Sequence, residues 1–361
     1  MTSGPPVGSN FPPTQHRHRR IRPSARVPTR RPLSIPTLAV ASVEATPAVA
    51  EAEHVVEVMG TRAHVIVVAP TLELADLLGT SAVARLVALE RTWSRFLPDS
   101  DLSRLNRNSG SVTSVSRDVV GLVERAVEAW HRTNGRYDPT VLPALLAQGY
   151  DRDFRELAAA PTRSAPLPTA PSPGCDGIRF GPTTVMMPVG TTIDPGGIGK
   201  GLAADWVTKQ VMTGGATGAC INVGGDLRVA GVGPTGNPWS VAIDHPLEAG
   251  RIIGHVELHD EALVSSWRTR RVWGAPGAER HHLIDPRTGA PAWTGLAGVT
   301  VTAPDAWWAE ALATALFLAG PEEAPALAQH HGVGALLVRD DGSVLGLGAL
   351  RAVVPHVTGG T

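Results

Sequence analysis

Residues 194–207 read Asp194-Pro195-Gly196-Gly197-Ile198-Gly199-Lys200-Gly201-Leu202-Ala203-Ala204-Asp205-Trp206-Val207. A strand-like pair, Thr192-Ile193, precedes this segment and a helical pattern ends it, so its glycines gather bare backbone N–H groups at a helix N-terminus. Such a terminus, with one ammonium beside it, favours anions and most often phosphate. Lys200 is one of only two lysines in a chain that otherwise uses arginine for positive charge. We therefore expect an anion site at which an ammonium serves better than a guanidinium.

Two familiar nucleotide-binding motifs are excluded. The segment has Gly-Lys-Gly where a Walker A loop has Gly-Lys-Ser/Thr, and Asp194 stands where that loop has its first glycine. The run from Gly231 to Gly236 satisfies the dinucleotide glycine pattern, but Asn237-Pro238-Trp239 leads into a strand instead of a helix. We expect this second run to be a hairpin loop.

The composition separates a tail from a folded domain. Residues 1–43 hold seven arginines, no acidic residue and many prolines, so we expect residues 1–50 to be a disordered tail and residues 51–355 to form the domain. Nucleic-acid binding through this tail is disfavoured, because its basic residues lack interleaved aromatics or a recognisable module. The chain of 361 residues is 43% hydrophobic and can bury a sizeable core.

The location of the protein is expected to be cytoplasmic. Arg30-Arg31 precede a weakly apolar run that carries Pro36, which leaves export by a twin-arginine signal as the alternative. The sequence contains no apolar stretch long enough to span a membrane. Cys175 and Cys220 are too few for a disulfide framework, and neither is placed where a lipid-modified N-terminus needs one.

Periodicity and turn residues outline the elements. The clearest is a helix capped by Ser116, whose apolar positions continue to Trp130 and whose stop is Gly135. Elsewhere we expect a strand pair at 54–68, helices at 71–93, 305–319 and 321–331, an exposed Pro/Ala/Ser-rich excursion at 158–176, a hairpin at 177–187, strands at 218–223, 226–230, 238–243, 252–258, 262–266 and 298–303, and a strand pair at 334–349. Consecutive short strands favour an α+β fold with mixed or antiparallel sheets and packed helices.

Four further segments carry candidate site residues, each with a plainer structural interpretation. The run from Asn222 to Asp226 either lets the backbone approach a ligand or makes a tight turn. Asp138 either caps a turn or holds a polar group of a ligand. His282 is either structural or a base tuned by its neighbours. Glu310 and Thr314 share one helix face, either as oxygen ligands of a metal or in a solvated or capping role.

These segments together resemble the family of FAD:protein FMN transferases, also called the ApbE or thiamine-biosynthesis-lipoprotein family. The matching segments are Met59-Gly60-Thr61, Trp93 to Asn106, Tyr137 to Val141, Asp194 to Asp205, Asn222 to Asp226, His282 to Gly289 and Ala309 to Leu316. The resemblance covers about residues 55–350 in the family's order. Each motif is weak alone, and their common order makes the signal strong.

The resemblance implies an α+β fold with FAD in a cleft. It also implies Mg²⁺-dependent transfer of the FMN half of FAD to a threonine or serine hydroxyl of an acceptor protein, with release of AMP. The hydroxyl attacks the flavin-side phosphorus of a pyrophosphate, and the metal neutralises charge on the leaving group.

The resemblance also implies roles for individual residues. His282 is the expected general base, because an imidazole with an ordinary pKa of about 6.5 can take a hydroxyl proton near neutral pH. Gly197 would offer a backbone carbonyl to Mg²⁺, with Glu310 and Thr314 supplying side-chain oxygens. The expected FAD contacts are Met59, Arg136, Tyr137, Asp138, Asp194, Lys200 and Ile284.

The chain departs from the family's usual pattern at two places. Glu310 stands where the family usually has aspartate, which moves the carboxylate by the length of a methylene. Ser265-Ser266-Trp267 stands where the family commonly has Thr-Ser-Gly, which brings an indole to the cleft. Two alternative functions therefore stay open: Mg²⁺-dependent hydrolysis of FAD to FMN and AMP, and binding of FAD without turnover.

Overall fold

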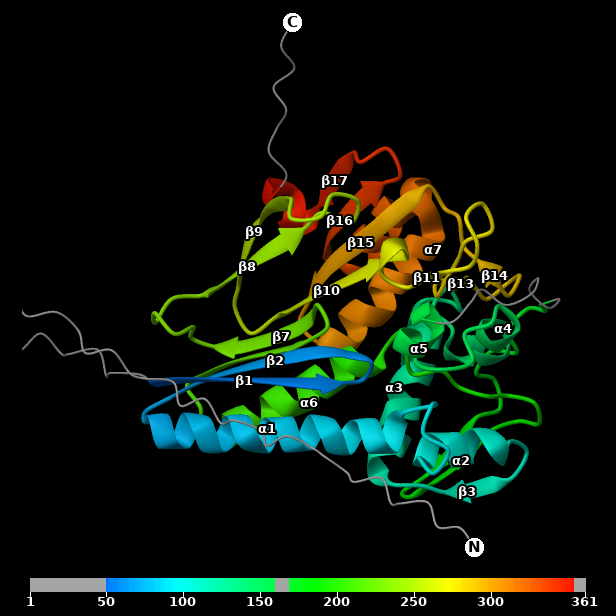
Figure 1. Ribbon diagram of the computed structural model, residues 1–361, viewed down its shortest axis with the longest axis horizontal. Helices are drawn as coiled ribbons and strands as arrows, with labels where there is room; N and C mark the ends of the chain where they lie inside the picture. Colours follow the sequence, from blue (N-terminus) through cyan, green and yellow to red (C-terminus); the bar gives the residue numbers. More distant parts are fainter. Residues whose placement is uncertain (1–49, 160–168, 354–361) are drawn as a thin grey trace, which may run out of the picture. The chain divides into compact units, whose positions relative to one another are not determined.

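The computed structural model describes residues 50–159 and 169–353, and an eight-stranded sheet is the largest element in it (Figure 1). The strand order is β1-β2-β6-β7-β10-β15-β16-β17, and every described pair is antiparallel. The strands are β1 (Ala50–Val58), β2 (Thr61–Ala69), β6 (Gly218–Val223), β7 (Asp226–Gly231), β10 (Ala262–Trp267), β15 (Leu296–Ala303), β16 (Gly334–Arg339) and β17 (Val344–Leu347). The expected α+β fold class with antiparallel pairing is confirmed.

The sheet is buried on both faces, as its alternating side chains require. On β2, Val65 and Val67 belong to the main core, whereas Ile66 and Val68 belong to a second cluster on the opposite face. Helices α1 (Leu72–Trp93), α6 (Gly199–Thr213) and α7 (Ala306–His331) cover the first face. A separate hairpin of β8 (Trp239–Asp244) and β9 (Ile252–Leu258) contributes to the second cluster.

The remaining elements lie outside the large sheet, and several of them, α2 to α5 among them, gather on the right of Figure 1. They are α2 (Asp101–Arg107), α3 (Arg117–Arg132), α4 (Leu142–Ala147), α5 (Phe154–Ala159), β3 (Val112–Ser114), β4 (Arg179–Gly181), β5 (Thr184–Met186), β11 (Val272–Trp273), β12 (Arg280–His281), β13 (Ile284–Asp285), β14 (Ala290–Pro291), and 3-10 turns at Pro139–Val141, Arg268–Arg270 and Gly348–Val353. The predicted hairpin at 177–187 is β4–β5, and β3 joins it as a third strand.

The expected helix caps and breaks are present. The Ser116 hydroxyl accepts a hydrogen bond from the backbone N–H of Val119 at 3.4 Å, at the start of α3. The helix ends at Arg132, and Gly135 follows with a φ of 74°. The two helices expected at 305–319 and 321–331 are the two parts of α7, which breaks at Gly320.

One expectation about a loop is wrong. The run from Gly231 to Gly236 is not a hairpin loop, because β7 pairs with β6 and β10 while β8 pairs with β9. The run instead leads the chain out of the large sheet into the two-stranded one. Its glycine pattern looks like a turn because Gly231 and Gly236 both have positive φ.

The helices α6 and α7 meet where each begins. Both carboxylate oxygens of Asp205 accept backbone N–H bonds at 2.9 Å, one from Ala306 and one from Trp307. At Gly201 a β-carbon would clash with the backbone of Ala306. Asp205 therefore supplies the N-terminal cap of α7, and Gly201 allows the two helices to cross closely.

Two expectations fall largely outside the described residues. These are the disordered tail at residues 1–50, except for Ala50, and the central part of the excursion, residues 160–168. Within the described residues, no helix has the length and apolar character needed to cross a membrane.

Candidate active site

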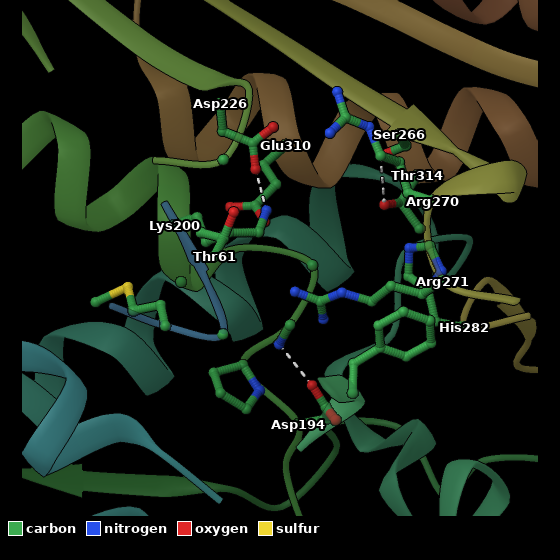
Figure 2. Close-up of a pocket in the computed structure, with 18 of the residues that line it drawn as sticks. Thr61, Asp194, Lys200, Asp226, Ser266, Arg270, Arg271, His282, Glu310 and Thr314 are labelled. Atoms are coloured by element: carbon green, nitrogen blue, oxygen red, sulfur yellow. Dashed lines mark hydrogen bonds and ion pairs between the residues drawn. The ribbon is translucent and has the colours of Figure 1, made fainter. Parts of the chain in front are cut away.

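A cavity of about 850 Å³ opens beside the ends of several strands of the large sheet and the beginnings of α6 and α7 (Figure 2). Its walls come from segments far apart in the sequence. Ten of the eleven residues predicted for the site line this cavity: Met59, Tyr137, Asp138, Asp194, Gly197, Lys200, His282, Ile284, Glu310 and Thr314. The geometry brings them together; their individual roles stay predictions.

Lys200 is held between two buried carboxylates. Its ammonium donates to Asp226 and, at 2.7 Å, to Oε1 of Glu310. The other oxygen of Glu310 accepts the backbone N–H of Gly201 at 2.8 Å. Glu310 and Asp226 are each 2% exposed, and Figure 2 shows all three side chains converging. The cluster links the first turn of α6 to α7 and to the start of β7.

The protonation of this cluster depends on burial and on the shared ammonium. Burial raises the pKa of Glu310 to about 7, with the charge of Asp226 adding to the rise and Lys200 opposing it. Burial opposes the charged form of Lys200, but Asp226 and Glu310 outweigh it and raise the lysine pKa. Two carboxylates on one ammonium give the ionised cluster a net negative charge, which attracts a cation.

The turn between β6 and β7 delivers Asp226 to the cavity. Gly224 and Gly225 have φ values of 69° and 100°, so this is the tight two-residue turn that glycine pairs favour. The amide oxygen of Asn222 accepts the N–H of Gly225 at 2.8 Å and closes the turn. The turn interpretation is confirmed, and the same turn also lines the cavity.

His282 has one ring nitrogen free. Its Nδ1 is buried without a hydrogen-bond partner among the described residues, and the ring lies near the backbone of Arg271. In the tautomer that has its proton on Nε2, Nδ1 keeps a lone pair that can accept a proton. Burial, followed by the nearby charge of Arg271, lowers the pKa of His282 well below 6.5. The expectation of an ordinary histidine pKa is wrong, and the ring is neutral at neutral pH.

The residues predicted to hold Mg²⁺ offer suitable donors. A β-carbon on Gly197 would lie 3.8 Å from Oγ1 of Thr314, so these two are neighbours, and Thr314 is one helical turn from Glu310. Each carboxylate oxygen of Glu310 bonds to one N–H group and keeps a second lone pair. No group of three His, Cys, Asp or Glu residues suited to a metal exists in the described chain. A carbonyl, a hydroxyl and one carboxylate fit Mg²⁺, which usually adds substrate phosphates and water.

Asp194 shapes the glycine-rich loop before α6. Its Oδ1 accepts the N–H of Gly196 at 2.5 Å, and its Oδ2 lies 2.7 Å from Nε of Arg95. The loop itself leads into α6 at Gly199, as the sequence predicts. The backbone N–H groups of this turn are thus fixed by a side chain that also lines the cavity.

Asp138 and Met59 make hydrogen bonds within the protein and also line the cavity. Oδ1 of Asp138 accepts both the N–H and the hydroxyl of Thr140, at 2.7 and 2.6 Å, so its capping interpretation holds while it also borders the cavity. Burial raises the pKa of Asp138. Met59 has a φ of 54° in the β1–β2 turn, and its N–H donates to Glu90 at 2.6 Å.

Arg136 does not line the cavity. Its guanidinium forms an ion pair with Glu323 on the second part of α7, and that glutamate is 64% exposed. The placement of Arg136 in the pocket is therefore not supported by the geometry.

Sequence reasoning missed several charged residues of the cavity. These are Arg95, Asp226, Arg270 and Arg271, which reach it from three different parts of the chain. Arg270 stacks over the indole of Trp267 at 4.5 Å, and Arg271 donates to the hydroxyl of Tyr150 at 3.0 Å. Trp267, which stands where the family commonly has glycine, thus packs against the guanidinium of Arg270. Arg95 and Asp226 stand in segments that the sequence singled out, and the run from Arg268 to Arg271 was the signal for the other two.

Comparison with known proteins gives one consistent result. The model of the ApbE family matches residues 59–337. The FAD:protein FMN transferase of Rhodobacter capsulatus is 31% identical over 277 residues, which are 75% of this chain and 52% of that protein. The FAD:protein FMN transferase of Haemophilus influenzae is 28% identical over 258 residues, 69% of this chain and 74% of that protein. The chain therefore spans about half the length of the Rhodobacter relative.

Solved structures share the fold. An ApbE protein from Thermotoga maritima superimposes with a TM-score of 0.74 at 24% identity, over 84% of this chain and 99% of that chain. A flavinyl transferase ApbE from Pseudomonas stutzeri, in its apo form, has a TM-score of 0.72 at 25% identity, over 87% and 98%.

Proposed function

The chain belongs to the ApbE family, and on that premise we propose that it transfers the FMN half of FAD to a threonine or serine hydroxyl of an acceptor protein, with release of AMP. The observation that carries the proposal is the free Nδ1 of a neutral, buried His282 in the same cavity as the glycine-rich loop and Lys200. The loop has the sequence pattern of an anion site and the imidazole is placed to act as a base, which are the two functions that this transfer needs.

In the proposed reaction the acceptor hydroxyl attacks the flavin-side phosphorus of the FAD pyrophosphate. The new bond joins the acceptor oxygen to this phosphorus, and the bond from phosphorus to the bridging oxygen breaks, so that AMP leaves with that oxygen. Nδ1 of His282 accepts the hydroxyl proton as the bond forms. The low pKa keeps this nitrogen unprotonated at neutral pH, and the resulting imidazolium is a strong acid that readily passes its proton on.

The chain's own residues bind and orient the pyrophosphate. The glycine-rich loop at the start of α6 would border the pyrophosphate, and the Asp194 carboxylate keeps that loop in place. Lys200 lies beside the same turn, with its charge shared between Asp226 and Glu310. Gly197, Glu310 and Thr314 would hold Mg²⁺, which supplies charge neutralisation to the leaving AMP when bound.

One assay separates this proposal from its two alternatives. Purified protein is incubated with FAD and Mg²⁺, with and without a candidate acceptor protein, and both AMP and covalently bound flavin are measured. We expect AMP and flavin-labelled acceptor in equal amounts, and only when the acceptor is present. AMP and free FMN without acceptor would instead identify an FAD hydrolase. Bound FAD with no AMP in any mixture would identify a flavin-binding protein without turnover.

A further inference from the structure

We infer that Arg95 is a flavin-binding residue that donates a hydrogen bond to a ring carbonyl of the flavin; the inference rests on the proposed function. Arg95 lines the cavity and its side chain is only 6% exposed. Its Nη2 is buried and has no hydrogen-bond partner among the described residues. A buried guanidinium N–H without a partner is costly, and a ligand oxygen beside it would remove that cost.

The other donors of Arg95 are already used and hold the guanidinium in one orientation. Nε lies 2.7 Å from Oδ2 of Asp194, and Nη1 donates to the backbone oxygen of Tyr150 at 3.0 Å. The guanidinium carbon lies 4.1 Å from the ring centre of Phe96 and 4.6 Å from that of Tyr150. One hydrogen bond, one ion pair and two ring contacts fix the plane of the group, so the direction of Nη2 is fixed as well.

The charge of this site favours a neutral acceptor. Arg95 and Asp194 form a buried pair whose charges cancel, so the spare N–H does not add a net positive charge to the cavity. The sites that suit phosphate lie elsewhere, at the start of α6 and beside Lys200. A carbonyl oxygen on a planar ring fits a neutral pair better than a phosphate does.

The surroundings of Arg95 suit a flat ring. Tyr150 belongs to an apolar cluster with Trp273 and Ile284, and Phe96 packs against that cluster. The ring centres of Tyr150 and Trp273 are 5.3 Å apart, and those of Phe96 and Tyr150 are 5.9 Å apart. All of these except Trp273 line the cavity. The flavin ring has carbonyl oxygens, whereas the adenine of FAD has none, so this wall favours the flavin end.

The test is a comparison of ligand fragments. The affinities of riboflavin, FMN, FAD and AMP are measured by titration for the wild type and for Arg95→Lys, which keeps a positive charge opposite Asp194 but loses the planar group. We expect about tenfold or greater weakening for the three flavins and a change of less than about twofold for AMP. One carbonyl stretching band of bound riboflavin should also move to higher wavenumber in the variant, because that carbonyl loses a hydrogen bond.

Arg85→Lys is the matched control. Arg85 likewise pairs with an aspartate, Asp118, at 2.7 and 2.8 Å and lies 5.7 Å from the ring centre of Trp206, but it does not line the cavity. This variant should lower the melting temperature and leave all four affinities within about twofold. If Arg95→Lys weakens AMP and riboflavin equally, Arg95 only positions the Asp194 loop and the inference is wrong.

A second measurement uses the wild type alone and applies even if Arg95→Lys does not fold. Riboflavin is compared with analogues in which one ring carbonyl is replaced by a thiocarbonyl, a weaker acceptor. One analogue should bind about tenfold more weakly; equal affinity of both analogues and riboflavin would overturn the inference. If the wild type binds no flavin at all, the proposed function fails as well. If it transfers FMN and Arg95→Lys binds riboflavin normally, only the inference fails.

Discussion

The ammonium of Lys200 lies 2.7 Å from a carboxylate oxygen of Glu310. Lys200 stands in the first turn of α6, and Glu310 stands near the beginning of α7. The pair connects the predicted anion site to the predicted metal site. Each residue therefore has a role in the fold that its functional prediction does not include, and substitutions at either position affect both stability and binding.

Removing the ammonium should destabilise the protein strongly. In Lys200→Met, two buried carboxylates, Asp226 and Glu310, face each other without a cation, which costs about 3–5 kcal/mol. Urea denaturation measures the loss. The exposed Lys209 provides the control, since Lys209→Met should change the free energy of unfolding by less than about 0.5 kcal/mol.

The loss of stability in Lys200→Met should also depend on pH. Burial already raises the pKa of Glu310 to about 7 in the wild type, above its unfolded value of about 4.3, and removal of Lys200 raises it further. The folded variant then binds more protons than the unfolded chain, so its stability falls as pH rises through this range. Equal stability of the variant at pH 5.5 and pH 8 would contradict this.

Glu310 should control metal binding. Calorimetric titration of Mg²⁺ into FAD-loaded protein should show at least about tenfold weaker binding for Glu310→Ala. Glu310→Asp should bind Mg²⁺ but lose about 1 kcal/mol of stability, because the shorter side chain cannot reach both Lys200 and the N–H of Gly201. Glu323→Ala, on an exposed part of α7, is the control. Unchanged Mg²⁺ affinity in Glu310→Ala would place the metal elsewhere.

Substitution of His282 should separate chemistry from folding. In His282→Gln a polar side chain of similar size remains beside the backbone of Arg271, but no base remains at this position. The transfer rate should fall about 100-fold to 10,000-fold, while FAD affinity and melting temperature stay near the wild type. A purely structural histidine would give the opposite pattern, with melting temperature and FAD affinity lowered together. Full transfer activity in the folded variant would falsify the assignment of the base.

The rate of transfer should not depend on the ionisation of His282 above neutral pH. Burial lowers the pKa of this ring well below 6.5, so the base is already deprotonated at pH 6.5. At saturating FAD and acceptor, titration of His282 should not change the rate from about pH 6.5 upward. The rate should fall only in more acidic buffer, where this ring becomes protonated. A rate that rises with a midpoint of about 6.5 would show an ordinary, solvated imidazole.

Arg136→Ala should leave FAD binding unchanged. The guanidinium pairs with the exposed Glu323 and does not border the cavity. We expect the FAD dissociation constant to stay within about twofold of the wild type, and the stability to change by at most about 1 kcal/mol, as for other exposed pairs. A tenfold weaker affinity would show that Arg136 reaches the ligand after all.

Much of the fold could be predicted because its signals are local. Ser116 and the apolar spacing after it define α3, and the glycines of the β6–β7 turn have the positive φ values that the sequence suggests. Short elements such as α2 and β3 have too few residues for a periodic pattern. The run after Gly231 was misread because strand pairing depends on contacts across the sheet, which a local turn pattern does not contain.

The site residues that stand in a sequence motif could be predicted, whereas the contacts between residues from distant segments could not. Lys200 and His282 stand in recognisable segments, and both line the cavity. The contact between Lys200 and Asp226 joins residues 26 positions apart, and no spacing rule on one helix or strand predicts it. The same holds for Arg95, whose partner Asp194 comes from a distant segment. The pairing of Arg136 with Glu323 likewise joins distant segments, so no local motif predicts it.

The close crossing of α6 and α7 at Gly201 fixes how the site can respond to a ligand. Asp205 holds the first N–H groups of α7, and the missing β-carbon of Gly201 lets the two backbones touch. A hinge or sliding motion between these helices would break both contacts. The two contacts therefore oppose any change in the spacing of these helices when a ligand binds. Replacement of Gly201 by any larger residue would separate the helices and change the distance between Lys200 and Glu310.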